Sequence, residues 1–409
     1  MSIKQFGVLC ILILLITPVL AEKDIIHKTL STSVVSESTV ESHTGTRYNE
    51  HPRITIFGDT EFAAQGWPGD GTPTDPFIIE NLNITADSEN CIMIFNVSIY
   101  FVIRNSIFTT SGEFADNIQI ISSRNGIIDN CTITGGRYGV YISSSSGITV
   151  ANSTIYGSTS IGITVYTSDN CVIQTNTIYG NVRGIRFQTT VNSIIMANVV
   201  YRSEQTGIVL FFNTADNQIF YNFIGWNGPP GFIDALNNAA DNGENNIWDD
   251  NASIGNFWSG YEGNEPYRIT GQGDARDRFP QYFNDTQKPQ IRRVGDLAYE
   301  DGDEQSHFVN WTANDAHPYR YEITRNSHLI ASGIWHNQDV IHDVGGLGEG
   351  VYNFTINFID GSGNQNNDTV RVFVVFVILG GIGTDLVGFA SILTAVVVLF
   401  SLVLVRKLR

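Results

Sequence analysis

Apolar residues recur along this chain at intervals of 22 to 26 residues, and they do so in three separate registers. Each of them lies in a short β-prone run, and the runs are separated by Gly, Asn, Ser and Asp. Three such runs per period predict a coil of three strands stacked on the next coil, which is a parallel β-solenoid. The positions expected inside are Ile84, Ile107, Ile133, Ile155, Ile178, Val200 and Ile224 in the first register, Val102, Ile128, Val150, Ile173, Ile195 and Ile219 in the second, and Ile92, Ile118, Val140, Ile163, Ile185 and Ile208 in the third.

A stacked solenoid explains why the chain repeats itself. One coil cannot bury its inward side chains alone, so equivalent side chains of neighbouring coils stack on one another. The sequence Thr-Ile-Tyr-Gly accordingly starts at Thr154 and again at Thr177. We expect about seven coils over residues 77–235. An asparagine ladder is predicted at Asn105, Asn176, Asn198 and Asn222, with Cys131 and Ser153 at the same place in two further coils.

Aromatic residues flank the repeats, and a different pattern follows them. We expect five aromatic side chains to pack on the end coils as caps: Trp67, Trp226, Trp248, Phe257 and Trp258. From about residue 284 to residue 375, short alternating strands such as 352–358 replace the long period. About 90 residues of this kind predict a β-sandwich, with Trp311 in its core.

The two ends of the chain predict an exported protein with a membrane anchor. Residues 1–21 combine Lys4, a short apolar core and small residues at the cleavage position, as a signal peptide does. Residues 22–50 are a Ser/Thr-rich spacer. The uncharged run 386–405 is long enough to span a bilayer, and the basic tail 406–409 follows it. We therefore expect a cell-membrane protein with its ectodomain outside and its C-terminus in the cytoplasm.

Composition excludes some partners. The formal net charge of −18 repels the phosphates of nucleic acids, so a nucleic-acid partner is not expected. After removal of the signal peptide, Cys91, Cys131 and Cys171 remain; their odd number and spacing predict small buried thiols. Acceptor sequences for N-glycosylation occur at Asn83, Asn96, Asn130, Asn152, Asn251, Asn284, Asn310, Asn353 and Asn367.

The flanks of the coils resemble a known family. GDGTPTDPFIIENL (69–82) and NIWDDNASIGNFWSGYEG (246–263), followed by PYRI and DRFP, are similar to the right-handed β-helix proteins grouped with NosD, the periplasmic copper-binding protein, and in particular to archaeal surface proteins of that type. The likeness covers about residues 54–280 and implies a right-handed solenoid. One departure is that the Asp- and Gly-rich segment usual before the Pro-Tyr motif is missing, which argues against a calcium-type cluster there.

Copper does not carry over from the resemblance. Copper sites need His, Cys or Met ligands. All eight histidines lie outside residues 52–306, and the coils hold only Met93, Met196 and three scattered cysteines. We therefore expect neither a metal site nor a cofactor.

The segment LGEGVYNFTINFIDGSGN (347–364) is similar to the late strands of immunoglobulin-like and cadherin-like surface domains. This resemblance places Tyr352 where such domains have a tyrosine corner. The expected fold is all-β. It consists of a capped right-handed parallel β-helix over residues 51–283, an immunoglobulin-like sandwich over 284–376, a linker over 377–385 and one transmembrane helix over 386–405.

Parallel β-helices include polysaccharide lyases, hydrolases and epimerases, so catalysis has to be weighed. Glycoside hydrolysis needs two carboxylates about 5 to 9.5 Å apart, which neighbouring coils would supply as acids one period apart. Only Asp87 and Glu113 approach that spacing, and the coils contain no Lys or His for a lyase. Asp249 and Asp250 are interpreted as turn and cap residues. We therefore assign no catalytic residue.

Outward side chains offer binding surfaces instead. Tyr156, Tyr179 and Tyr201 each follow an inward residue and are expected to stack along one outer face. Aromatic side chains beside polar groups suit sugar rings, although aromatic ladders also simply stabilise neighbouring strands. A second outer face is expected to carry Tyr141, Tyr166, Arg186 and Gln188, with Arg183 at the nearby turn. The candidate carbohydrate-binding residues are Tyr156, Tyr179, Tyr201, Tyr141, Tyr166, Arg183 and Arg186.

These patterns predict a membrane-anchored extracellular β-helix protein that binds carbohydrate or mediates adhesion without catalysis. Its expected partner is an extracellular glycan or a cell-surface polymer. Two alternatives stay open at this point: an enzyme acting on external glycans, and a purely structural envelope protein.

Overall fold

The computed structural model describes residues 48–376 apart from 230–236 and the single positions 262, 264, 273, 284 and 304. These residues belong to one compact unit. The predicted signal peptide, most of the spacer and the predicted membrane span lie outside them. Within the described part of the chain, no helix is long and apolar enough to cross a membrane.

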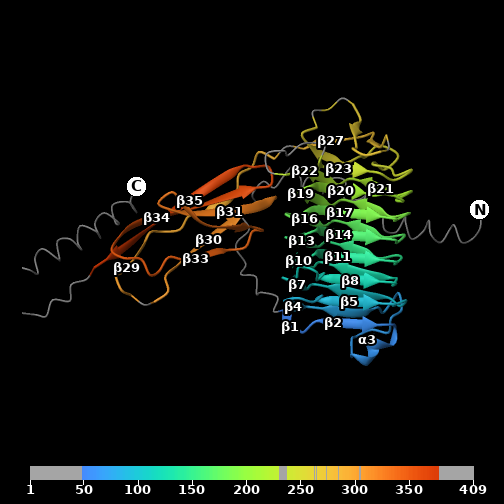
Figure 1. Cartoon of the computed structure of the whole chain (residues 1–409), viewed down its shortest axis with the longest axis horizontal. Helices are drawn as coiled ribbons and strands as arrows, with labels where there is room; N and C mark the ends of the chain where they lie inside the picture. The colour runs from blue at the N-terminus through green and yellow to red at the C-terminus, as the bar shows by residue number, and fades with distance from the viewer. Residues whose placement is uncertain are drawn as a thin grey trace, which may run out of the picture. The chain divides into compact units, whose positions relative to one another are not determined.

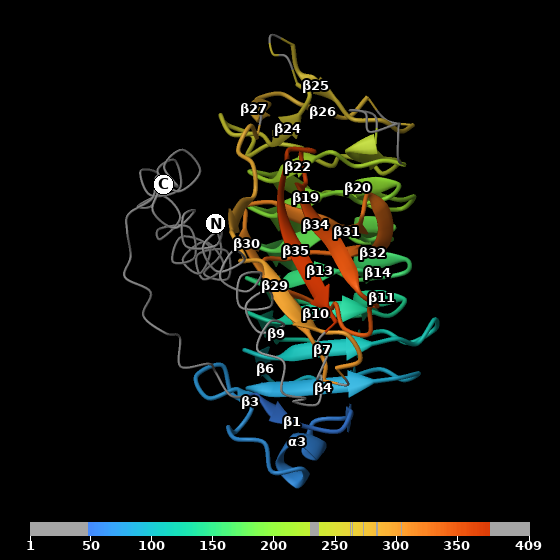
Figure 2. The ribbon, with the colours of Figure 1, turned by 90° about the vertical axis from the view of Figure 1, so that its left-hand side faces the viewer.

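Parallel strands stack coil upon coil in a right-handed solenoid of about eight turns (Figure 1). Three sheets, here called I, II and III, form its sides. Sheet I contains β1 (Asn49–Glu50), β4 (Leu82–Ala86), β7 (Ile107–Thr110), β10 (Thr132–Gly135), β13 (Thr154–Tyr156), β16 (Thr177–Tyr179), β19 (Val199–Tyr201), β22 (Phe223–Gly225), β24 (Phe257–Ser259) and β27 (Gln281–Phe283). Figure 2 shows successive strands of this sheet side by side.

The other two sheets are built from the same coils. Sheet II contains β3 (Phe77–Glu80), β6 (Phe101–Arg104), β9 (Gly126–Asp129), β12 (Thr149–Ala151), β15 (Val172–Gln174), β18 (Ile194–Met196) and β21 (Gln218–Phe220). Sheet III contains β2 (Ile54–Phe57), β5 (Ile92–Phe95), β8 (Ile118–Ile121), β11 (Tyr138–Ser143), β14 (Ile161–Tyr166), β17 (Arg183–Gln188), β20 (Thr206–Leu210) and β23 (Ala239–Asp241). The short pair β25 (Tyr267–Arg268) and β26 (Arg276–Asp277) is antiparallel.

The three apolar registers line the interior of the solenoid, one register to each sheet. The whole third register pairs in sequence across sheet III, and its members are fully buried. The run Ile155, Ile178 and Val200 pairs likewise across sheet I, and each side chain is 0% exposed. The sequence prediction of stacked inward positions is therefore confirmed for these residues.

Two predicted inward positions are wrong by one residue. In sheet I, Ile84 pairs with Phe108, so Phe108 is buried and Ile107 is turned outward. In sheet II, Ile103 takes the buried place that was predicted for Val102. Both errors lie beside the longest interval of the repeat, where two apolar residues are adjacent. A shift of one residue turns a side chain to the opposite face of a strand, and periodicity alone does not choose between neighbours.

The predicted asparagine ladder is present and extends beyond the expected coils. Oδ1 of Asn198 accepts hydrogen bonds from the backbone N–H and the side-chain amide of Asn176, both at 3.0 Å. Oδ1 of Asn222 does the same for Asn198, at 2.9 Å. The ladder continues through Asn256 and ends at Asp277, whose Oδ2 accepts the N–H of Asn256 at 2.6 Å. Each link satisfies a buried backbone donor.

Serine and cysteine hold the earlier ladder positions. The N–H of Cys131 donates to Oγ of Ser153 at 3.1 Å, as their predicted equivalence requires. The position expected for Asn105 is instead occupied by Ser106, whose Oγ accepts the N–H of Leu82 at 3.0 Å. The prediction for Asn105 is wrong by one residue, as it is for Ile107, because periodicity alone does not choose between neighbouring positions.

A row of glycines stands where sheet III follows the turn from sheet I. A Cβ atom on Gly184 would lie 2.4 Å from the carbonyl oxygen of Gly207 and 2.5 Å from Cγ1 of Val200. Gly139 and Gly162 meet the next coil in the same way. The repeated Gly-Ile sequence is thus required by the close approach of successive coils.

Aromatic residues close both ends of the solenoid. At one end, the helix α3 (Thr60–Ala64) buries Phe62 completely in the core. At the other, Trp248 and Trp258 are 0% exposed, and the indole N–H of Trp258 donates to Oδ2 of Asp277 at 2.8 Å. Trp67 packs against the same core. The cap prediction holds for these three tryptophans, whereas Trp226 and Phe257 belong to an aromatic cluster outside sheet I.

A β-sandwich follows the solenoid. Its three-stranded sheet contains β28 (Gln290–Arg292), β30 (Phe308–Asn314) and β33 (Val340–Asp343). Its five-stranded sheet contains β29 (Leu297–Glu300), β35 (Gln365–Val375), β34 (Gly350–Asp360), β31 (Pro318–Arg325) and β32 (His328–Ile334). Trp311 is buried between the sheets, as expected, and Phe354, Ile356 and Phe358 are buried there as their alternation predicted.

Candidate functional site

The outer face of sheet III carries a group of basic and aromatic side chains, here called the basic aromatic face: Arg137, Tyr138, Tyr141, Arg183 and Arg186. The rings of Tyr138 and Tyr141 stack with their centroids 5.5 Å apart and their planes 13° from parallel. The guanidinium carbon of Arg137 lies 4.5 Å from the centroid of Tyr138, and that of Arg186 lies 5.5 Å from it. Two cations therefore contact one aromatic ring.

The repeat explains why these residues meet. Tyr141 pairs with Thr164, and Thr164 pairs with Arg186, so the three occupy one outward row over three coils. Their chain neighbours Val140 and Phe187 are fully buried, which turns the row outward. Tyr138 and Arg183 share a second row, in register with β14 between them. The small side chain of Thr164 lets the longer ones approach one another across it.

One carboxylate stands beside the face and is already paired. Oδ1 and Oδ2 of Asp116 accept hydrogen bonds from Nε and a terminal nitrogen of Arg137, both at 3.1 Å, and Nε2 of Gln119 also donates to Oδ2. The side chain of Asp116 is 0% exposed. Burial raises the pKa of Asp116, while its bonds to Arg137 act in the opposite direction. Asp116 therefore neutralises Arg137 and holds it over the ring of Tyr138.

The other two cations have no such partner. Within the described residues, neither Arg183 nor Arg186 forms an ion pair, and Nε of Arg186 is buried without a hydrogen-bond partner. The hydroxyl oxygen of Thr164, between the strands of the face, is also buried and unpaired. Burial and the charge of Arg186 lower the pKa of Arg183. Buried polar groups are ordinarily satisfied, so this face has unused capacity to donate hydrogen bonds to an anion.

The sequence identified part of this face. Tyr141, Arg183 and Arg186 are brought together as predicted, and Tyr166 lies one row away, opposite Gln188 and 38% exposed. Sequence reasoning missed Arg137, Tyr138 and Asp116, which stand at the turn into sheet III and do not repeat from coil to coil. The strand register could have identified Tyr138, because Tyr138 occupies the same row as Arg183, two coils away.

The second predicted face also stacks, but it is covered. The rings of Tyr156 and Tyr179 lie 5.3 Å apart, and those of Tyr179 and Tyr201 lie 5.0 Å apart, both pairs nearly parallel. They are 9%, 1% and 0% exposed in chain order. The hydroxyl of Tyr156 bonds to Nε2 of His336 at 3.1 Å, and that of Tyr201 donates to the carbonyl of Pro318 at 2.7 Å.

Stacking of the three rings on one outer face is thus confirmed. The three rings are not exposed to solvent as expected, because residues of the sandwich cover them. Their assignment as carbohydrate-binding residues stays a prediction from the sequence.

The acidic residues considered for catalysis do not form a pair beside the basic aromatic face. Asp87 and Glu113 are both exposed. Asp249 is bound by the guanidinium of Arg278 at 2.5 Å, and Oδ1 of Asp250 accepts three backbone N–H groups of its own turn. Their interpretation as turn and cap residues is therefore confirmed.

A comparison with protein-family models gives a match over most of the solenoid. A family model described as periplasmic copper-binding protein (NosD) matches residues 36–263. A comparison with curated protein sequences gives no match. Among solved structures, an alginate lyase from Paenibacillus sp. str. FPU-7 is 12% identical, with 57% of this chain and 95% of that chain covered and a TM-score of 0.28.

Two further structures match at comparable levels. The A-module of a mannuronan C-5 epimerase from Azotobacter vinelandii is 13% identical, with 57% of this chain and 81% of that chain covered and a TM-score of 0.29. Fibronectin(III)-like modules from Clostridium thermocellum are 18% identical, with 22% of this chain and 96% of theirs covered and a TM-score of 0.17. At such scores, no argument about function follows from these likenesses.

The copper of the family description does not fit the described solenoid. Cys91, Cys131 and Cys171 are buried, and each thiol bonds to backbone carbonyls rather than facing a common point. Burial raises the pKa of each thiol to about 12, so none is the thiolate that binds metal. Met93 and Met196 belong to different sheets. We derive no chemistry through copper.

Family membership rests on the extent of the match and on the fold. The family model spans more than half of the chain and coincides with the stacked coils. The two longer flanking motifs, residues 69–82 and 246–263, lie within the matched region. The chain belongs to the NosD family of β-helix repeat proteins.

Proposed function

We propose that this protein binds an anionic glycan outside the cell through the basic aromatic face, and that it does so without catalysis. The observation that carries the proposal is the pair Arg183 and Arg186, which has no carboxylate partner among the described residues although the whole chain has a net charge of −18. In so acidic a protein, two adjacent uncompensated guanidinium groups favour a negatively charged ligand.

The chemistry of the face matches acidic sugars. A guanidinium group donates two parallel hydrogen bonds to a carboxylate or sulfate, with a geometry that an ammonium lacks. The stacked rings of Tyr138 and Tyr141 offer an apolar surface for the carbon face of a sugar, with hydroxyl groups at their rims. Tyr166 extends the same outer face by one row. The face would thus recognise a uronate or sulfated unit by charge and its ring by stacking.

The state of the carboxylate at this face favours binding without catalysis. Asp116 is the carboxylate placed at this face, and it is buried and paired with Arg137. A glycosidase would need a second carboxylate at a defined distance from it. A purely structural role would not require two unpaired arginines. We place the glycan outside the cell, with the sandwich as an immunoglobulin-like spacer; the hydroxyl of Tyr352 donates to the carbonyl of Gly348 at 3.1 Å, as in a tyrosine corner.

Binding to defined polymers tests the proposal. The full chain is titrated with polygalacturonate and alginate as acidic probes, and with dextran and mannan as neutral ones. Each charge-assisted hydrogen bond contributes about 1.5–3 kcal/mol, so the double variant Arg183→Ala/Arg186→Ala is expected to bind an acidic polymer at least about tenfold more weakly. The matched control Arg292→Ala/Arg293→Ala removes two exposed arginines of the sandwich and should bind as wild type does.

Salt and turnover separate the alternatives. Binding through the arginines must weaken as ionic strength rises. Equal loss in both double variants would mean that general charge, not this face, holds the polymer. Absence of binding to every polymer would support the structural role. Release of reducing ends or of unsaturated products by the wild-type chain would show that the protein is an enzyme and contradict non-catalytic binding.

A further inference from the structure

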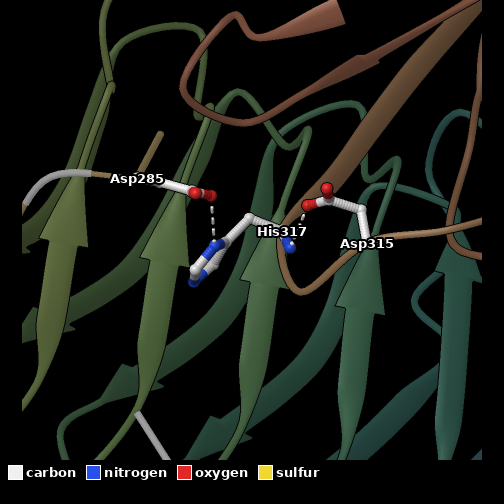
Figure 3. Close-up of side chains that lie close together, drawn as sticks. All are labelled: Asp285, Asp315 and His317. Carbon is white, nitrogen blue, oxygen red and sulfur yellow. Dashed lines mark hydrogen bonds and ion pairs between the residues drawn. The ribbon is translucent and has the colours of Figure 1, made fainter. Parts of the chain in front are cut away.

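A second polar cluster lies in the sandwich, remote in sequence from the basic aromatic face. Asp285 precedes β28, and Asp315 and His317 lie in the turn between β30 and β31 (Figure 3). One ligand atom from each of the three lies within 4.8 Å of the others. Nδ1 of His317 is 2.9 Å from Oδ2 of Asp285, and Oδ1 of Asp315 accepts the backbone N–H of His317 at 2.8 Å.

These groups are shielded from water. The side chain of Asp285 is 6% exposed and that of His317 is 10% exposed. Trp226 and Phe283 flank the imidazole, with ring centroids 5.7 and 5.4 Å from it. The aromatic surroundings fix the ring orientation of His317 and reduce the hydration of any charge beside it.

Negative charge at this place is balanced only in part by basic side chains: the charge of Arg202 interacts with that of Asp360, but its Nε donates to the carbonyl of Gly361 at 2.6 Å. Asp360, the last residue of β34, is fully buried, and its Oδ1 accepts the N–H of Gly363 in the turn that follows. Among the described residues, no Arg or Lys forms an ion pair with Asp285, Asp315 or Asp360. Oδ2 of Asp315 also accepts no hydrogen bond from any described residue. A group of carboxylates shielded from water normally has a positive partner in direct contact, and among the described residues only the imidazole of His317 makes such a contact here.

The cluster is also held in place before any ligand arrives. The side-chain amide of Asn364 donates to the backbone carbonyls of Asp285 and Gln287, at 3.1 and 2.7 Å. Oδ1 of Asp360 accepts the N–H of Asn364 at 2.8 Å. The segment bearing Asp285 is therefore tied to the turn after β34, so binding would require little rearrangement of the backbone.

We propose that Asp285, Asp315 and His317 bind one divalent transition-metal ion of the zinc type. One imidazole nitrogen and two carboxylate oxygens are a ligand set that suits zinc, whereas calcium prefers oxygen ligands alone. Two carboxylates also balance the charge of the ion. The ion would bridge the segment before β28 and the β30–β31 turn, and so stabilise the N-terminal part of the sandwich.

The chain provides a matched control for the experiment. His307 and Asp303 form a similar histidine–carboxylate pair, with Nε2 of His307 3.2 Å from Oδ2 of Asp303. No third ligand joins them among the described residues. The variants His317→Gln and His307→Gln therefore make the same chemical change with and without the proposed site.

Calorimetric titration of the untagged, chelator-treated full chain with zinc chloride tests the proposal. We expect one equivalent of zinc to bind, a rise of the melting temperature with zinc concentration, and at least about a tenfold loss of affinity in His317→Gln but not in His307→Gln. Asp315→Asn, which preserves shape, provides a second variant in case His317→Gln melts early without metal. Equal zinc binding in wild type, His317→Gln and Asp315→Asn would overturn the site. Preference for calcium over zinc, or no zinc binding by the wild-type chain, would overturn it as well.

Discussion

Asn198 is the place where the ladder can be tested most directly. Its Oδ1 accepts two hydrogen bonds from Asn176, and its side-chain nitrogen donates to the carbonyls of Ile173 and Met196 at 2.8 and 3.1 Å and to Oδ1 of Asn222 at 2.9 Å. The residue is 0% exposed. Replacing it by alanine removes all of these hydrogen bonds at once, at a position closed to solvent.

The magnitude follows from the groups left unpaired. In Asn198→Ala, the backbone N–H of Asn176 and the carbonyl of Ile173 each lose a buried partner. An unsatisfied buried group costs about 1–3 kcal/mol, so we expect the free energy of unfolding to fall by about 3–5 kcal/mol. Asn198→Ser should cost only about 1–2 kcal/mol, because a hydroxyl restores the acceptor. Ser153 already shows this arrangement, with its Oγ accepting from Cys131 and donating to the carbonyl of Ala151.

Urea unfolding followed by far-ultraviolet circular dichroism measures both changes. The expected order of stability is wild type, then Asn198→Ser, then Asn198→Ala. If the alanine variant loses less than about 1 kcal/mol, or is no less stable than the serine variant, the ladder does not stabilise the stack in the way described.

Four further outcomes are expected. Tyr179→Phe should leave stability unchanged or raise it by about 1 kcal/mol, because its buried hydroxyl has no partner, whereas Tyr201→Phe should lower it by a similar amount in thermal melts. Gly184→Ala should reduce the yield of folded protein or lower its melting temperature sharply, since its Cβ would overlap the next coil. Cys171 and the two other thiols, with their pKa raised to about 12 by burial, should resist alkylation at pH 8 until the chain unfolds. Burial, together with nearby carboxylates, raises the pKa of Asp315 to about 6 from 3.8, so the metal-free chain should lose stability as pH rises from about 4 to 6; Asp315→Asn should remove that part of the pH dependence in melting curves.

The repeat made the solenoid predictable because stacking forces equivalent positions to agree. Ile155, Ile178 and Val200 could be aligned from sequence alone, since each coil there has nearly the same length. The prediction failed at Ile107 and Val102, where two apolar residues are adjacent beside the longest interval of the repeat and only the three-dimensional pairing selects one. Local period carries no information about that choice.

The sites were harder to predict for physical reasons. The stacking of Tyr179 on its neighbours followed from the repeat, but the tyrosine cluster is covered by Ile334 of the sandwich, more than 100 residues away in sequence. Arg137 and Asp116 form their pair across two coils at turns whose lengths vary, so no period marks them. Asp285 and His317 meet through the pairing of sandwich strands, which has no repeat at all.

The contact between the tyrosine stack and the sandwich also limits how this solenoid can change in length. A duplicated coil would form the same asparagine-ladder and glycine contacts as its neighbours, so a coil could be added elsewhere without new kinds of interaction. A coil inserted between β16 and β19 would move Tyr201 by about 4.8 Å along the stack, away from the carbonyl of Pro318 that accepts its hydroxyl. Contact with the sandwich therefore fixes the number of coils in the central part of the solenoid. Gain or loss of coils during evolution should therefore be confined to parts of the solenoid that the sandwich does not touch.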